Sequence, residues 1–296
     1  MVSNLRKIII GTAHFGVKYG INNDKENFKN LLNVINYLNK NKVELFFDCS
    51  ENYHNSFRLI KKLLKLKKFQ FKIIYKIDVN THLKSKDVLK DYLKHKIKKF
   101  CKNLELKNGN IILMLHNENL IFKKNFHFLY EILLNLKKEK SVLDFGYSIY
   151  NFKKLKKKIF KFKPNILQLP FNMADRSISN KELELIKNYK IKIHARSIFL
   201  QGMLMRKFDE LPKKFYKFKK YWETFEINLN MSNAEKELSL LIYVFNNKNI
   251  DKIIIGNTNL AQLQLINKIK KQKPKNFFPN IKSSKEKKYL LRPYNW

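Results

Sequence analysis

Four side chains in this sequence are of the types that transfer a proton to an oxygen atom: Asp48, Tyr53, Lys76 and His116. A tyrosine hydroxyl has a pKa of about 10 and is a weak acid at neutral pH. A nearby ammonium stabilises the phenolate and lowers that pKa, and a carboxylate holds the ammonium in place. A neutral imidazole beside them can orient a carbonyl oxygen. If the fold brings the four together, we expect them to protonate an oxygen.

Each of these residues also has an ordinary structural interpretation. Asp48 opens a polar run that is typical of a turn or a helix N-cap. Lys76 stands in the apolar run Ile74–Ile77, so its ammonium either reaches solvent along its own stem or has a buried partner. His116 fits a strand-end histidine bonded to the backbone, and Tyr53 is one of 14 tyrosines. The chemical interpretation therefore depends on the elements that position these residues.

Short β-rich runs alternate with longer runs of helical periodicity along the whole chain, which indicates repeated βα units and a parallel sheet. Several runs are apolar nearly throughout, as in Ile111–Leu115, and such strands are buried on both faces. The predicted fold class is α/β, a single-domain (β/α)8 TIM barrel. Its eight expected strands are Lys7–Thr12, Val43–Asp48, Phe71–Ile77, Asn110–His116, Val142–Ser148, Ile166–Phe171, Ile191–Ser197 and Lys252–Gly256.

Polar residues fall where these strands end rather than in their interiors. Asp48, His116 and Ser148 close three expected strands, and Lys76 and Arg196 lie near the ends of two more. The C-terminal ends of all strands of a (β/α)8 barrel meet on one face, so residues far apart in sequence become neighbours around one pocket. The barrel therefore predicts that the four proton-transfer residues share a site.

The chain resembles the aldo-keto reductase family, in its bacterial form, from about Ile8 to Ile269. Gly11–Gly16 is similar to the family's G-T-x-x-F-G strand end, and Phe47–Ser56 is similar to F-D-T-A-x-x-Y-G-x-S. Lys76 and His116 match the other two positions of the family's tetrad. The resemblance implies NAD(P)H-dependent reduction of an aldehyde or ketone by hydride transfer, with Tyr53 as the general acid, Lys76 and Asp48 tuning it, and His116 orienting the carbonyl.

Further segments resemble the family's cofactor-binding strands: Gly146–Ser148, Gln168–Asn172, His194–Gly202, Ile253–Gly256 and Gln262–Leu263. The resemblance assigns cofactor binding to Gly11, Thr12, Ser148, Gln168, Arg196, Ser197, Leu200, Gly202, Gly256 and Gln262. The implied cofactor is NADPH. NADH stays open, because Asn257, Thr258 and Asn259 replace the common contacts to the 2′-phosphate and Ile266 replaces an adenine-holding Asn.

The charge of the chain raises an alternative function. The formal net charge of +38 would suit a nucleic-acid partner. However, only six of the 62 basic residues are Arg, and readers of bases and phosphates rely on the bidentate guanidinium. We expect a solvated lysine-rich surface, with a basic nucleic-acid-associated protein as the alternative. A second alternative is a catalytically weak or inactive nicotinamide-binding barrel with a sensor or regulatory role.

The expected organisation is a barrel over residues 1–275, with a long loop at about 203–230 as a candidate lid, and a basic, aromatic tail over 276–296. No run approaches the length of a membrane span, and the two cysteines support neither a disulfide framework nor a zinc site. No H-E-x-x-H or G-x-G-x-x-G motif is present, so we expect no metal. We predict a cytoplasmic enzyme that acts on a small carbonyl compound. The sequence identifies neither the particular substrate nor the oligomeric state.

Overall fold

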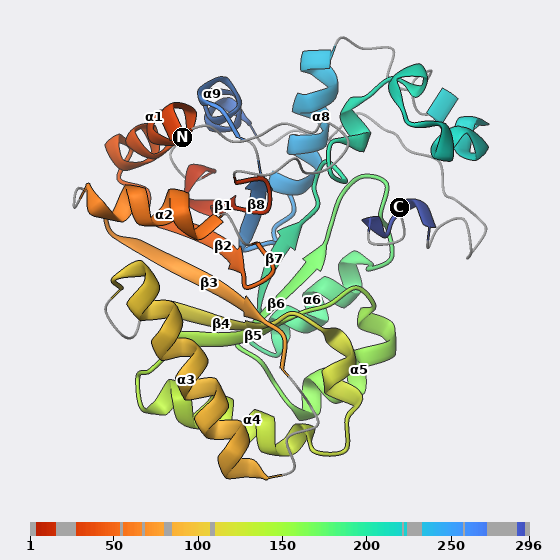
Figure 1. Cartoon of the computed structure of the whole chain (residues 1–296). Coiled ribbons are helices and arrows are strands. Elements are labelled where there is room, and N and C mark those ends of the chain that lie inside the picture. Colours follow the sequence, from red (N-terminus) through yellow and green to blue (C-terminus); the bar gives the residue numbers. More distant parts are fainter. Residues whose placement is uncertain are drawn as a thin grey trace.

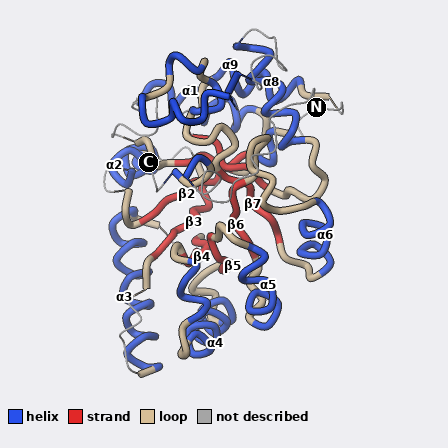
Figure 2. The backbone as a smooth tube through the Cα atoms, turned by 90° about the vertical axis from the view of Figure 1, so that its right-hand side faces the viewer, coloured by secondary structure: helices blue, strands red, loops and turns tan. Residues whose placement is uncertain are grey.

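The computed structural model describes residues 4–15, 28–53, 56–66, 69–79, 85–106, 110–220, 222–223, 233–256, 258–270 and 289–293. Eight parallel strands pair in chain order, and β1 pairs with β8 to close the barrel. Helices surround the strands on the outside (Figures 1 and 2). The predicted (β/α)8 barrel is confirmed.

The strands are β1 (Ile8–Gly11), β2 (Leu45–Ser50), β3 (Phe71–Ile77), β4 (Ile111–Leu115), β5 (Asp144–Ser148), β6 (Ile166–Pro170), β7 (Lys192–Arg196) and β8 (Lys252–Gly256). The helices are α1 (Phe28–Lys40), α2 (Ser56–Lys65), α3 (Lys86–Leu104), α4 (Phe126–Lys138), α5 (Phe152–Lys161), α6 (Asn180–Asn188), α8 (Asn233–Phe245) and α9 (Leu260–Lys268). Short 3₁₀ helices precede β1 (η1, Leu5–Lys7) and follow β4 (η2, Glu118–Phe122) and β7 (η3, Met203–Met205; η4, Phe208–Glu210; η5, Lys213–Phe218).

The alternation of side chains along each strand separates two apolar cores. In β4, Ile111, Leu113 and Leu115 belong to the large core between the strands and the helices. The intervening Ile112 and Met114 belong to a smaller cluster inside the barrel, whose members are Ile9, Phe46, Ile74, Ile112, Met114, Ile166 and Ile254. This cluster fills the middle of the barrel, so polar inward-facing residues can gather beyond it at the strands' C-terminal ends.

Two strand ends differ from the prediction in ways that affect the site. β2 continues two residues past Asp48, because Cys49 and Ser50 pair in register with Tyr75 and Lys76 of β3. β7 ends at Arg196 rather than Ser197, because the φ angle of Ser197 is 57° and a left-handed residue cannot continue a strand. Ser50 therefore lies on the strand, on the same face as Asp48.

The segment after β7 forms its own small core, here named the loop cluster: Met173, Ala174, Leu200, Met203, Leu204, Leu211, Phe215, Phe218, Trp222, Leu240, Leu290 and Leu291. The C-terminal residues in it lie beside the β7–α8 segment (Figure 1). Arg292 ties them to the barrel through a 2.6 Å ion pair with the buried Asp175. Residues 221 and 224–230 of the expected lid, and 276–288 and 294–296 of the expected tail, lie outside the described residues.

None of the helices in the described ranges combines the length and apolar character that crossing a bilayer requires.

Candidate active site

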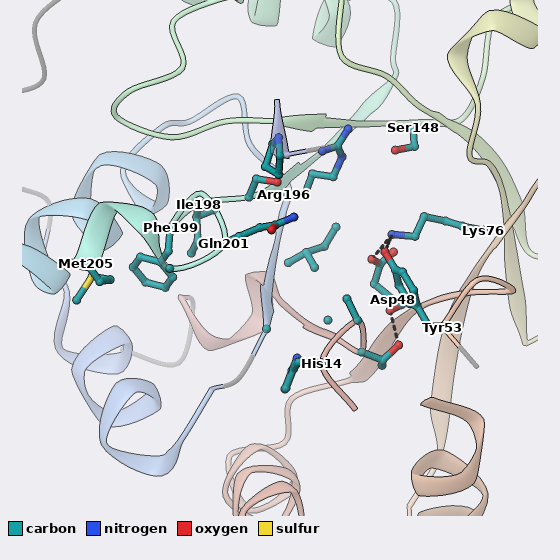
Figure 3. Close-up of a pocket in the computed structure, with 18 of the residues that line it drawn as sticks. His14, Asp48, Tyr53, Lys76, Ser148, Arg196, Ile198, Phe199, Gln201 and Met205 are labelled. Carbon is teal, nitrogen blue, oxygen red and sulfur yellow. Dashed lines mark hydrogen bonds and ion pairs between the residues drawn. The ribbon is translucent and has the colours of Figure 1, made fainter. Parts of the chain in front are cut away.

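A cavity of about 460 Å³ opens at the C-terminal ends of the strands. Most of the predicted site residues line it: Gly11, Thr12, Asp48, Tyr53, Lys76, His116, Ser148, Arg196, Ser197, Gly202, Gly256 and Gln262. Asp48, Tyr53 and Lys76 lie on one side, and Phe199, Gln201 and Met205 on the other (Figure 3). The barrel thus brings the four proton-transfer residues to a single cavity.

The ammonium of Lys76 links two of its predicted partners. Its Nζ lies 2.7 Å from Oδ2 of Asp48 and 3.4 Å from the hydroxyl of Tyr53. Lys76 and Asp48 are each 3% exposed, so both charges are nearly removed from water. Burial lowers the pKa of Lys76, but the charges of Asp48 and Tyr53 and the hydrogen bond to Asp48 outweigh it and leave the pKa raised. The amine therefore stays protonated at neutral pH.

Asp48 is also held by two hydrogen bonds from residues other than Lys76. Its Oδ1 accepts a hydrogen bond from Nε2 of Gln168 at 3.0 Å, and its backbone carbonyl accepts one from the hydroxyl of Thr12 at 2.9 Å. Gln168, which is fully buried, lies under the site and not among the residues that line the cavity. In the structure, Gln168 holds the carboxylate of Asp48 in position beside Lys76.

A clamp of polar groups holds the short segment that carries Tyr53. The carboxylate of Glu51 lies 2.6 Å from Nζ of Lys96 on α3 and accepts a 2.5 Å hydrogen bond from the backbone N–H of Asp78. The side-chain amide of Asn52 donates to Asp78 at 3.0 Å. These contacts tie the end of β2 to the end of β3. Because Glu51 and Asn52 precede Tyr53 directly, they also fix the backbone position of Tyr53.

His116 stands just past β4, and its backbone N–H donates to Ile77 at 3.0 Å. Its Nδ1 lies 3.3 Å from the hydroxyl of Ser50. Burial, followed by the positive charge of Lys76, lowers the pKa of His116 from 6.5 to about 4. The imidazole is therefore neutral at physiological pH.

The opposite side of the cavity is built from strained backbone. Ser197, Leu200 and Gln201 have positive φ angles of 57°, 48° and 55°, and Gly202 follows at 87°. Such conformations cost of order 1–3 kcal/mol for a residue other than glycine and gather at ligand sites. Leu200 itself packs into the loop cluster with 1% exposure and does not line the cavity.

Arg196 connects the two sides. Its guanidinium stacks over the ring of Tyr150, with 4.1 Å from Cζ to the ring centroid, and donates to the backbone carbonyl of Ile149 at 3.3 Å. Its buried Nε has no hydrogen-bond partner among the described residues. A donor of this kind is suited to a ligand oxygen in the cavity.

Two further buried atoms in the described residues lack partners near β8. They are the hydroxyl oxygen of Thr258, which lies between the cavity residues Gly256 and Asn259, and Oε1 of Gln262. Together with Nε of Arg196 they leave three buried hydrogen-bonding atoms without partners on the β7–β8 side, and Arg196 and Gln262 line the cavity. Nε of Arg196 and the hydroxyl of Thr258 can donate to a ligand oxygen, whereas Oε1 of Gln262 can accept from a ligand hydroxyl or amine, so the set fits polar groups of a dinucleotide.

Some residues in or next to the cavity were not predicted, among them Ser50, which contacts His116 but does not line the cavity. Ser50 follows Asp48 by two positions on one strand face, so the alternation of β2 could have found it once the strand's true end was known. Glu237 of α8, which accepts a 2.5 Å hydrogen bond from Gln262, carries no sequence signal because the path of the β7–α8 segment decides where α8 lies. Asn257 lies outside the described residues.

No group of three or more His, Cys, Asp or Glu side chains that could hold a metal ion occurs within the described ranges.

A closed parallel barrel with a polar cavity at the C-terminal ends of its strands has the architecture of TIM-barrel enzymes. The sequence model of the Aldo/keto reductase family matches residues 7–286. The chain therefore belongs to the aldo/keto reductase family. No curated protein matches the chain at a significant level.

Solved structures with the same fold are distant in sequence. An aldo-keto reductase from Bacillus halodurans, in its holo form, is 14% identical with a TM-score of 0.66, and the match covers 96% of this chain and 90% of that one. A glycerol dehydrogenase from Gluconobacter oxydans is also 14% identical, with a TM-score of 0.61 and the same coverage of both chains. An aldo-keto reductase from Klebsiella pneumoniae in complex with NADPH is 11% identical, with a TM-score of 0.59 and coverage of 98% and 91%.

Proposed function

We propose that this protein is an NAD(P)H-dependent carbonyl reductase that converts an aldehyde or ketone to an alcohol, with Tyr53 as the general acid. The observation that carries the proposal is the buried Lys76 ammonium, which lies 2.7 Å from Asp48 and 3.4 Å from the hydroxyl of Tyr53 at the cavity wall. Family membership supports the reaction class.

Each residue of the tetrad has a defined task in the proposed reaction. The ammonium of Lys76 stabilises the phenolate that Tyr53 becomes when it gives its proton to the developing alkoxide. Asp48 keeps that ammonium charged and in place. The neutral imidazole of His116 orients the carbonyl oxygen by hydrogen bonding. Because Lys76 and Asp48 are already paired, little rearrangement is needed when the proton moves.

The proposed cofactor is NADPH, which supplies the hydride when bound. We expect Arg196 and Gln262, which line the cavity, to hold it with the atoms that lack protein partners, and the strained segment 197–202 to face its phosphates. The complex of the Klebsiella pneumoniae protein with NADPH supports this choice. Titration with NADPH and with NADH, followed by fluorescence, measures the preference directly.

The experiment that tests the function is Tyr53→Phe, assayed for NADPH oxidation on a panel of aldehydes and ketones. Positioned acid catalysis contributes about 10² to 10⁴ in rate, so kcat should fall by that factor while the Kd for NADPH stays nearly unchanged. Tyr130→Phe is the matched control, because the hydroxyl of Tyr130 donates to Lys163 in an exposed hydrogen bond and Tyr130 does not line the cavity. Equal turnover by Tyr53→Phe and wild type would exclude Tyr53 as the acid.

The same assays separate the alternatives. A wild-type protein that binds NADPH but reduces no carbonyl on the panel is a nicotinamide-binding barrel without this activity. A protein that binds an oligonucleotide, with affinity that falls steeply as salt rises, and does not bind NADPH would be the basic nucleic-acid-associated protein instead.

A further inference from the structure

A buried serine hydroxyl contacts the histidine of the candidate site. Ser50 is 0% exposed, and its Oγ accepts a hydrogen bond from the backbone N–H of Asn52 at 3.3 Å. The same Oγ lies 3.3 Å from Nδ1 of His116. Both contacts follow from the extra two residues of β2, which place Ser50 beside Lys76 on β3 and close to the end of β4.

The ring of His116 carries a single N–H at neutral pH, because burial holds its pKa at about 4. That hydrogen is on either Nδ1 or Nε2, and the two tautomers present different groups to the cavity. The His116 ring lines the cavity, and its Nδ1 is engaged by Ser50. Nε2 is therefore the nitrogen left for a ligand.

A count of hydrogens at Ser50 distinguishes the two tautomers. If Nδ1 carried the hydrogen, the Ser50 oxygen would accept both from it and from Asn52. The hydroxyl hydrogen of Ser50 would then have no acceptor among the contacts of the described residues, in a fully buried position. If Nδ1 is bare, the hydroxyl donates to it. The Ser50 hydroxyl, Nδ1 of His116 and the N–H of Asn52 are then all paired.

We propose that Ser50 is a positioning residue that holds His116 in the Nε2–H tautomer, so that the imidazole offers a donor and not a lone pair to the cavity. A carbonyl oxygen is the ligand chemistry that such a donor recognises. The tautomer itself depends only on contacts within the protein, whereas its use in carbonyl binding rests on the function proposed above. The similar family motif F-D-T-A-x-x-Y has Ala at the position of Ser50, so the hydroxyl departs from that motif.

The test is ¹⁵N NMR of histidine-labelled protein without cofactor, which distinguishes protonated from bare ring nitrogens. The chain has seven histidines, and the His116 signals are assigned by their loss in His116→Gln. We expect Nε2 protonated and Nδ1 bare in the wild type. Ser50→Ala should shift the tautomer ratio about fivefold toward Nδ1–H, the change expected from one net hydrogen bond, and Ser50→Thr should retain the bias.

Ser239→Ala is the matched control, because it removes another buried serine hydroxyl, one that donates to Glu235 within α8. It should leave the His116 signals unchanged. A wild-type ring with Nδ1 protonated overturns the inference, and so does a Ser50→Ala ring that keeps the wild-type ratio. Because the spectra need no turnover, their outcome is independent of the Tyr53→Phe result, which tests the proposed function. In turnover assays, Ser50→Ala should lower kcat up to about fivefold with an unchanged Kd for NADPH.

Discussion

The two sides of the cavity differ in how completely their polar groups are paired. On the β2–β3 side, Asp48, Lys76 and Glu51 each contact more than one partner inside the protein. On the β7–β8 side, Arg196 and Gln262 each retain a buried atom without a partner among the described residues. Complete pairing holds reacting groups in a fixed geometry, whereas unfilled positions are suited to a ligand that arrives later. The contrast supports the proposal that the β2–β3 side carries out the chemistry and the β7–β8 side binds the cofactor.

Breaking the paired side should have the largest effect. Lys76→Met leaves the carboxylate of Asp48 buried without its ammonium, and loss of one partner of a buried ion pair costs about 3–5 kcal/mol in the free energy of unfolding. Denaturant unfolding measures this loss. Lys72→Met is the matched control on the same strand, because Lys72 is 35% exposed and its ion pair with Glu44 is largely solvated.

A double variant sharpens this prediction. Asp48→Asn combined with Lys76→Met removes both buried charges, so it should recover part of the stability that Lys76→Met alone loses. If the double variant lost more free energy of unfolding than the two single variants lose in sum, the unpaired buried charge would not be the cause of the loss.

Acid should also act on the paired side. The pKa of His116 is lowered to about 4 in the folded protein, while the ring titrates near 6.5 when unfolded. Between these values the unfolded state binds a proton that the folded state does not, so stability falls as the pH decreases from about 6.5 to about 4. The slope is up to about 1.4 kcal/mol per pH unit for this group.

His194, inside the barrel, adds to the same trend, because burial lowers its pKa to about 3. Because His116 contributes to this dependence, His116→Asn should flatten part of the change of the unfolding free energy with pH. An unchanged slope in His116→Asn would argue against a neutral buried imidazole at this position.

The smallest of these effects is expected on the unfilled side. Arg196→Met should raise the Kd for NADPH about tenfold, as expected for loss of a charge-assisted hydrogen bond, with little change in the stability of the free protein. Fluorescence titration and thermal unfolding measure the two quantities. Arg206→Met, which removes an arginine paired with Glu210, is the control for loss of positive charge. A large loss of stability with unchanged affinity would reverse the roles of the two sides.

The barrel and the meeting of distant residues could be predicted from the sequence, because both follow from local patterns. Nearly continuous apolar strands such as β4 indicate burial on both faces, and parallel strands bring their C-terminal ends together. Asp48, Tyr53, Lys76 and His116 lie near strand ends, so their common cavity follows from the topology.

What the sequence did not indicate depends on contacts between segments. The exact end of β2 depends on pairing with β3, and this pairing places Ser50 against His116. The clamp of Glu51 by Lys96 requires α3 to pass beside the end of β2, which no local pattern encodes. Gln168 was expected at the cofactor; in the structure its side chain is fully buried, donates to Asp48 and does not line the cavity, a contact between β6 and β2 that no local pattern indicates.

The ion pair between Arg292 and Asp175 has a practical consequence. It anchors residues 289–293 against the loop cluster and brings Pro293 into the wall of the cavity. Asn4, by contrast, donates to Ile269 beside η1, at the end of the barrel away from the cavity. A substitution that breaks the ion pair between Arg292 and Asp175 should therefore alter ligand access to the cavity, whereas one at Asn4 should leave it undisturbed.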